Sequence, residues 1–117
     1  VDPAGIGDEN ISTARDITRA AIAAAVHTDV SLASGAKTWN VRFSDDRSKT
    51  FNTTNKLSWR EVDWVVAKTG YTDTARACFT GVYEKNGRRI AITTLGAWFS
   101  FRRWKDVNEI INWVDKH

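Results

Sequence analysis

Asn86-Gly87, which stands between two runs rich in β-branched and aromatic residues, restricts the fold of this chain more than any other feature. The runs are "CFTGVYEK" before the dipeptide and "RRIAITTLGA" after it. Asn and Gly tolerate the positive φ values that a two-residue hairpin turn requires. A third run, "VDWVVAKTG", has the same strand-forming composition. The sequence therefore predicts three antiparallel strands.

Helices are expected before and after these strands. Thr13 and Asp16 stand at capping-box spacing before an alanine-rich helix that reaches about Val26. Its small side chains call for a closely packed neighbour, and we expect that neighbour to come from outside this chain. A closing helix from Arg103 to Asp115 carries an apolar stripe at helical spacing, made of Trp104, Val107, Ile111 and Val114.

A further hairpin is predicted between the first helix and the three strands. "TWNVRF" and "TFNTTNKL" flank the polar turn "SDDRSK". Trp39, Val41 and Phe43 alternate with polar residues, which indicates a half-buried strand. Helix, hairpin, three strands and closing helix together predict the α+β class, an antiparallel sheet covered by helices.

Composition narrows the function. A chain of 117 residues is one domain or part of one, and no apolar stretch approaches the 18 residues of a membrane span. The net charge of +3 is mild and the basic residues are scattered, so we expect no nucleic-acid partner. The single cysteine, Cys78, is expected to be a buried thiol. His27 and His117 lie far apart and have no acidic or cysteine neighbours at metal-ligand spacing, so we expect no metal site.

Lys68-Thr69-Gly70, at the expected end of the strand "VDWVVAKTG", is the candidate binding motif. An ammonium and a hydroxyl one residue apart can both reach a carboxylate if the strand edge bends there. Gly70 removes a side chain, so a substrate backbone can lie close. An exposed edge strand can also pair with an extended peptide. The tripeptide alone is weak support, because it is frequent by chance.

The order of several blocks makes the motif more specific. "VDPAGIGDENISTARDI" comes first, "NTTNKL" follows, and Lys-Thr-Gly then continues as "KTGYTD" before a hairpin and a final helix. Lys-Thr-Gly is the third motif of penicillin-binding proteins. From Val1 to about Trp113 the chain resembles the serine D-alanyl-D-alanine carboxypeptidases and endopeptidases, the low-molecular-mass penicillin-binding proteins, and most of all their penicillin-binding protein 7-like group.

The resemblance implies serine acyl transfer on peptidoglycan stem peptides, without a metal or cofactor, in the periplasm or cell envelope. It also implies the fold of the penicillin-binding transpeptidases and β-lactamases. In that family, the serine of a Ser-x-x-Lys motif attacks the D-Ala carbonyl, and a Ser-x-Asn motif helps to relay protons. Carried over, Lys68 and Thr69 hold the terminal carboxylate of a stem peptide or a β-lactam, beside Gly70. The backbone N–H of Tyr71 is one oxyanion-hole donor.

Two departures from the family pattern stand out. Arg76 occupies a position where the family has Gly. The nucleophile motifs of the family precede the first block, so we expect residues 1–117 to be the C-terminal portion of a single D,D-peptidase domain, partnered by its upstream half or by another copy. The alternative is a catalytically silent truncated or split module that binds a peptide or a partner chain.

No stretch within the chain replaces the nucleophile motifs convincingly. Ser34 and Lys37 fit Ser-x-x-Lys by letter, but we expect a surface turn there. Thr53-Thr54-Asn55 imitates Ser-x-Asn, but the family block accounts for it. The six tryptophans are expected mainly in the core rather than on a sugar-stacking face, whereas an exposed aromatic group is expected at Trp98, Phe99 and Phe101.

Overall fold

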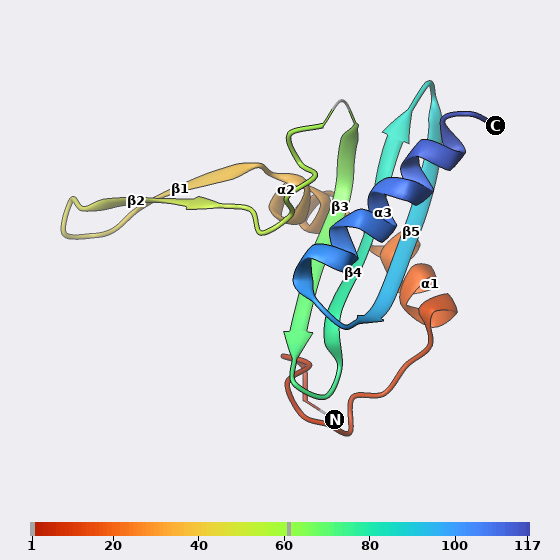
Figure 1. Cartoon of the computed structure of the whole chain (residues 1–117). Coiled ribbons are helices and arrows are strands. Elements are labelled where there is room, and N and C mark those ends of the chain that lie inside the picture. The colour runs from red at the N-terminus through yellow and green to blue at the C-terminus, as the bar shows by residue number, and fades with distance from the viewer. Residues whose placement is uncertain (1, 61) are drawn as a thin grey trace.

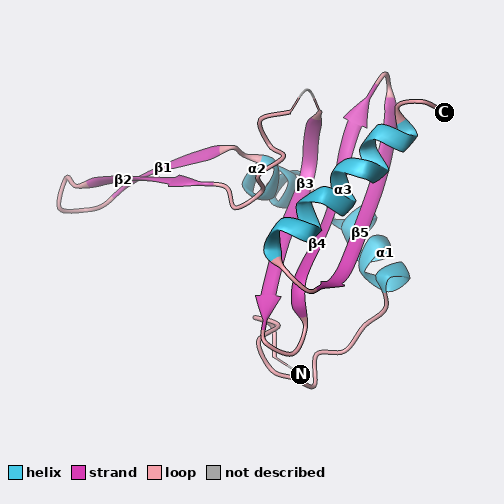
Figure 2. Ribbon diagram, viewed as in Figure 1, coloured by secondary structure: helices cyan, strands magenta, loops and turns pink. Residues whose placement is uncertain are grey.

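The computed structural model describes residues 2–60 and 62–117. The described strands form one three-stranded sheet and one separate two-stranded hairpin. Figures 1 and 2 show helices packed on the larger sheet and the hairpin at its side. In chain order the elements are α1 (Ala14–Ala24), α2 (Thr28–Gly35), β1 (Thr38–Arg42), β2 (Ser48–Asn52), β3 (Asp63–Thr72), β4 (Arg76–Lys85), β5 (Arg88–Ala97) and α3 (Ser100–Val114). No helix in the described ranges has the length and apolar character needed to cross a membrane.

The three predicted strands form one antiparallel sheet in the order β3-β4-β5. Asn86 and Gly87 have φ values of 51° and 71°, so both residues of the turn are in the left-handed region that the dipeptide favours. Lys85 pairs with Arg88 directly across this turn. The hairpin prediction is confirmed, and β3 lies at one edge of the sheet.

Helices cover both faces of the sheet, as Figure 1 shows for α3 in front and α1 behind. The α3 face holds the larger core, where Phe79 of β4 meets the rings of Trp64 and Trp104 edge-on at 5.3 and 5.6 Å. Val107 and Ile111 of α3 are fully buried there, so the predicted stripe is confirmed, although the helix begins at Ser100. Each such side chain contributes about 1.5–3 kcal/mol through burial. The α+β prediction is confirmed.

The alanine-rich face of α1 packs on the opposite face of the sheet. Thr13 caps this helix, and its hydroxyl accepts a hydrogen bond from the Asp16 amide at 3.1 Å, as the capping-box spacing predicted. Ala21 and Ala25 are buried in one cluster with Val66 and Val82. The expectation that this face lacks a partner in the chain is therefore wrong. Small side chains let the helix lie close to the strands, and the sheet itself is the neighbour they require.

The β1–β2 hairpin projects away from the sheet (Figure 1). Its pairing is confirmed, with Trp39 opposite Phe51. Its predicted half-buried face is wrong, because Trp39 and Phe51 remain 54% and 46% exposed. Alternation in sequence marks a face that can be covered, and no described element lies across this one.

Two of the six tryptophans, Trp64 and Trp104, are buried, and the other four are exposed. The expectation of mainly internal tryptophans is therefore wrong for most of them. The exposed aromatic group after β5 is confirmed: Trp98 is 70% exposed, and the rings of Phe99 and Phe101 stack at 5.6 Å.

Candidate functional site

Lys68-Thr69-Gly70 lies inside β3, which continues to Thr72, so the expectation that the motif ends the strand is wrong. Lys68 is opposite Thr80 of β4, and Thr69 is opposite Phe79. Opposite residues of antiparallel strands share a face of the sheet. Thr69 therefore lies with Phe79 on the face that α3 covers, whereas Lys68 lies on the face that α1 covers. The exposed Lys68 ammonium donates a hydrogen bond to the carbonyl oxygen of the next residue, Thr69.

The hydroxyl of Thr69 is held by Thr54, a residue of the "NTTNKL" block. Their Oγ1 atoms lie 2.7 Å apart. The block is shaped by the buried Asn55. Its side-chain Oδ1 accepts a hydrogen bond from the Leu57 backbone N–H at 3.0 Å, and its own backbone N–H donates to Thr53 Oγ1 at 3.1 Å. Asn55 thus fixes a turn, and this turn presents Thr54 to the motif. The sequence reasoning missed Thr54, because only its place inside the block pointed to it.

A hollow of about 300 Å³ lies beside the motif. Lys68 and Thr54 line it together with Trp39, Phe51 and the end of α2. Ser34 lines it too, so the structure brings this serine and Lys68 to one hollow.

The geometry at Ser34 is that of a helix residue rather than of the surface turn expected there. Ser34 lies in α2, and its hydroxyl donates to the Val30 carbonyl at 2.8 Å. Lys37, the other half of its letter pattern, lies over the Trp59 ring at 5.5 Å. The serine hydroxyl and this lysine thus have different partners.

Gly70 and Tyr71 form the open end of the motif. Gly70 is exposed, and a Cβ atom added there would meet only Cys78 Cβ, at 3.9 Å. The Tyr71 phenol is 61% exposed. The carbonyl oxygen of Gly70 accepts a hydrogen bond from Arg103 Nη1 at 3.0 Å. The sequence analysis named Arg103 only as the first residue of the closing helix and assigned it no role in the site. Its spacing of four residues from Val107 nevertheless places a charge on the apolar stripe.

Arg76 begins β4 with a φ of 59°, in the left-handed region that favours glycine. This backbone explains why a Gly is usual there in the family that the sequence resembles. The Arg76 guanidinium carbon lies 2.9 Å from the centre of the Trp98 ring. Stacking on an aromatic face offsets part of the strain of a left-handed L-residue.

We expect Arg76→Gly to be more stable to urea than Arg76→Ala by about 1 kcal/mol. Both variants lose the stack on Trp98, but only alanine keeps the cost of the left-handed backbone. Trp98→Ala serves as the control, because it removes the stack and leaves residue 76 unchanged. An Arg76→Ala variant as stable as Arg76→Gly would contradict the assigned backbone conformation.

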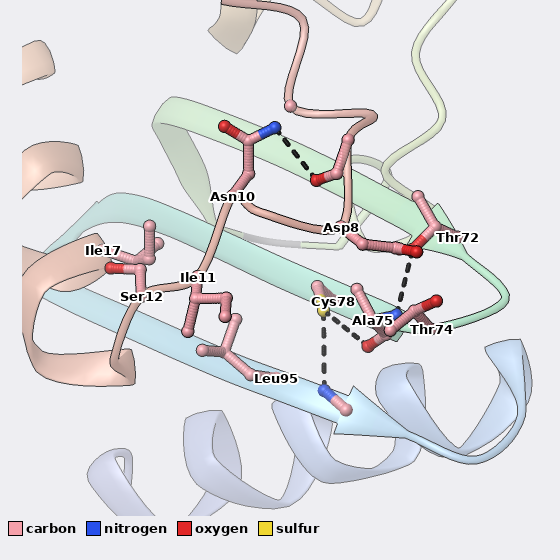
Figure 3. A pocket seen from close by; sticks show the side chains of 13 residues that line it. Asp8, Asn10, Ile11, Ser12, Ile17, Thr72, Thr74, Ala75, Cys78 and Leu95 are labelled. Carbon is pink, nitrogen blue, oxygen red and sulfur yellow. Dashed lines mark hydrogen bonds between the residues drawn. The ribbon is translucent and has the colours of Figure 1, made fainter. Parts of the chain in front are cut away.

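A second hollow, of about 390 Å³, lies between the N-terminal segment and the β3–β4 turn (Figure 3). Cys78 lines it, with its sulfur 3.3 Å from the Ala75 carbonyl oxygen and 3.5 Å from the Gly96 amide. The thiol is half-buried, so the expectation of a buried cysteine is wrong. The register shift of β4 against β5 falls beside Cys78, which leaves its side chain at an opening rather than under a neighbouring strand.

The N-terminal wall of this hollow is tied by Asp2. Its carboxylate accepts from the Gly7 amide at 2.8 Å and from Asn10 Nδ2 at 2.6 Å. Hydrogen bonds to the Gly7 amide and then to Asn10 lower the pKa of Asp2 to about 2. Among the described residues, no three His, Cys, Asp or Glu side chains gather as metal ligands would.

The family model described as D-alanyl-D-alanine carboxypeptidase matches residues 1–98 of this chain. A D-alanyl-D-alanine endopeptidase of Escherichia coli (strain K12) is 27% identical over 118 residues, which span 98% of this chain and 38% of that protein. The sequence resemblance is thereby confirmed.

Solved structures agree. The Streptomyces K15 DD-transpeptidase superposes with a TM-score of 0.81 at 24% identity, over 92% of this chain and 44% of that one. A D-alanyl-D-alanine carboxypeptidase of Mycobacterium tuberculosis gives 0.59 at 27% identity, over 74% and 32%. The predicted membership of this fold is confirmed, and the chain spans less than half the length of each of these three relatives.

Proposed function

Because this chain belongs to the D-alanyl-D-alanine carboxypeptidase family, we propose that it is the C-terminal portion of a serine D,D-peptidase domain and carries its third substrate-binding motif. The domain acts as a carboxypeptidase or endopeptidase on the D-Ala-D-Ala ends or cross-links of peptidoglycan stem peptides, in the periplasm or cell envelope. Penicillins acylate the same site. The nucleophile and its lysine come from a segment outside these 117 residues.

The arrangement at the edge of β3 supports this proposal best. The strand is open on one side within the described sheet, so an extended peptide can pair with it. Lys68 supplies positive charge at the hollow, and the Thr69 hydroxyl, oriented by Thr54, would donate to the terminal carboxylate of the substrate. The open space above Gly70 leaves room for the substrate backbone.

The proposed reaction proceeds by acyl transfer. The serine oxygen adds to the D-Ala carbonyl carbon, and the Tyr71 N–H would stabilise the resulting oxyanion. The carbonyl–nitrogen bond then breaks, and the leaving amine takes the proton that the Ser-x-x-Lys lysine removed from the serine hydroxyl. Water hydrolyses the ester in a second step, which frees the serine. In a penicillin the β-lactam bond is the one that opens, and the leaving amine stays attached, so the acyl-enzyme persists.

We predict that the 117-residue chain alone forms no covalent adduct with labelled penicillin. A second polypeptide, encoded immediately before Val1 and carrying Ser-x-x-Lys and Ser-x-Asn, should bind the chain and restore labelling. Gel fluorescence and mass spectrometry of the labelled peptide measure both effects.

Two results would change the proposal. A stable adduct on a serine of the chain itself, with Ser34 as the first position to inspect, would show that the nucleophile lies within it. If the codons before Val1 encode neither motif and the chain still binds stem peptides without acylation, the silent-module alternative replaces the enzyme.

A further inference from the structure

Arg103 is a buried charge at the back of the binding motif. Its side chain belongs to α3 and is only 8% exposed, among Trp104 and the rest of the α3-face core. Within residues 2–60 and 62–117 it forms no ion pair, and its Nε atom has no hydrogen-bond partner. Burying a guanidinium without a carboxylate is costly. The contacts that hold it there are therefore informative.

Those contacts are two backbone carbonyls on neighbouring strands. Arg103 Nη1 donates to Gly70 O of β3 at 3.0 Å and to Cys78 O of β4 at 3.1 Å. Gly70 and Cys78 are direct partners in the sheet register. The guanidinium thus bridges the two strands at the binding motif, and charge-assisted bonds of this kind are stronger than neutral ones.

One of these carbonyls belongs to the peptide group that matters for catalysis. The Gly70 carbonyl and the Tyr71 N–H are the two ends of a single planar group, and no peptide bond in the described chain is cis. In a trans peptide the C=O and the N–H point in opposite directions. With the carbonyl turned toward Arg103 and β4, the Tyr71 N–H is turned away from them.

We propose that Arg103 is a positioning residue for the oxyanion hole: it fixes the plane of the Gly70–Tyr71 peptide and polarises it, so that the Tyr71 N–H is aimed and strengthened as a donor. This inference rests on the proposed function, in which that N–H meets the oxyanion. A hydrogen bond accepted at one end of an amide strengthens the donor at the other. A donor fixed before the reaction costs no reorganisation when the oxyanion forms.

The test compares Arg103→Met and Arg103→Lys with Val107→Ala in the complete protein. Val107 lies one turn further along α3, is fully buried, and is not among the residues that bond the motif. It therefore controls for simple loss of core packing. Arg103→Lys keeps a donor that reaches one carbonyl and should rescue part of the effect, and it serves in place of Arg103→Met if that variant does not fold.

The first readout is the residual dipolar coupling and amide proton shift of Tyr71 in ¹⁵N-labelled protein. We expect both to change in Arg103→Met, to return partly in Arg103→Lys, and to stay at wild-type values in Val107→Ala. Wild-type values in both Arg103 variants would overturn the proposal. This readout needs no enzymatic activity, so it decides the inference even if the protein does not react with penicillin, a result that would refute the proposed function alone.

The second readout is penicillin acylation, resolved into its maximum rate and half-saturating concentration. Arg103→Met should lower the maximum rate about tenfold or more, because an oxyanion contact exists only after attack. The half-saturating concentration should change less than about threefold. A fall in the maximum rate no larger than that of Val107→Ala would contradict the positioning role. An effect on the half-saturating concentration alone would contradict it too.

Discussion

Lys68→Ala is expected to slow penicillin acylation of the complete domain roughly 30- to 1000-fold. The side chain carries a positive charge to the hollow that would receive the carboxylate of the substrate. Removing one preorganised electrostatic group costs on the order of 2–4 kcal/mol of transition-state stabilisation, and each 1.4 kcal/mol is about tenfold in rate. Stopped-flow measurement with a fluorescent penicillin gives the rate directly.

The fold should survive this substitution, because Lys68 is exposed. Its stability should stay within about 0.5 kcal/mol of the wild type, as for most surface changes. Lys116→Ala removes the same charge just beyond α3 and is the matched control. Lys68→Arg keeps the charge and should retain more activity than Lys68→Ala. If Lys68→Ala acylates at the wild-type rate, Lys68 is not the carboxylate anchor.

The sequence predicted the elements whose structure depends on local chemistry. The turn at Asn86-Gly87 follows from backbone freedom, and the start of α1 follows from the Thr13 cap; both are properties of a few neighbouring residues. The stripe of α3 is periodic, and its buried apolar members Trp104, Val107 and Ile111 are residues that the period selects. Such signals survive in any tertiary context.

Features that depend on distant packing were predicted poorly. Only a surface turn was predicted around Ser34, and no helix was predicted over the eight residues of α2. This helix has no side-chain cap bond and no buried residue, so its stability comes from contact with β3. The partner of the α1 alanines was sought outside the chain, although Val66 of β3 and Val82 of β4 supply it. Exposure of Trp39 was missed because alternation shows only that a face can be covered.

The same division holds in the candidate site. Lys68, Thr69 and Gly70 were found as a contiguous motif. Thr54 reaches Thr69 across 15 positions, and Arg103 reaches Gly70 across 33. Neither contact can be recognised from neighbouring residues in the sequence. The position of Arg103, four residues before Val107 on an apolar stripe, was the one detectable anomaly.

Gly35→Ala is expected to lower the stability of the fold by about 1–3 kcal/mol, toward the upper end of that range, as for overpacked cores. A Cβ atom at Gly35 would lie 2.6 Å from the Trp64 carbonyl oxygen and 2.9 Å from that of Val65. These are backbone atoms of β3, at the point where its register shifts between Trp64 and Val66. Because no side-chain rotation relieves the clash, α2 must move off the strand.

Gly70→Ala is the matched control, because a Cβ there meets only one atom, at an ordinary 3.9 Å. Urea or thermal unfolding should therefore show a Tm drop of several degrees or more for Gly35→Ala, at about 4–8 °C per kcal/mol, and almost none for Gly70→Ala. The two variants should affect acylation for different reasons. In Gly70→Ala the added methyl would obstruct the substrate backbone directly. In Gly35→Ala any loss of acylation rate would come from displacement of α2, because Ala33 and Ser34 of this helix line the hollow with Lys68. Equal stability of the two variants would mean that α2 does not lie against β3 as closely as the structure has it.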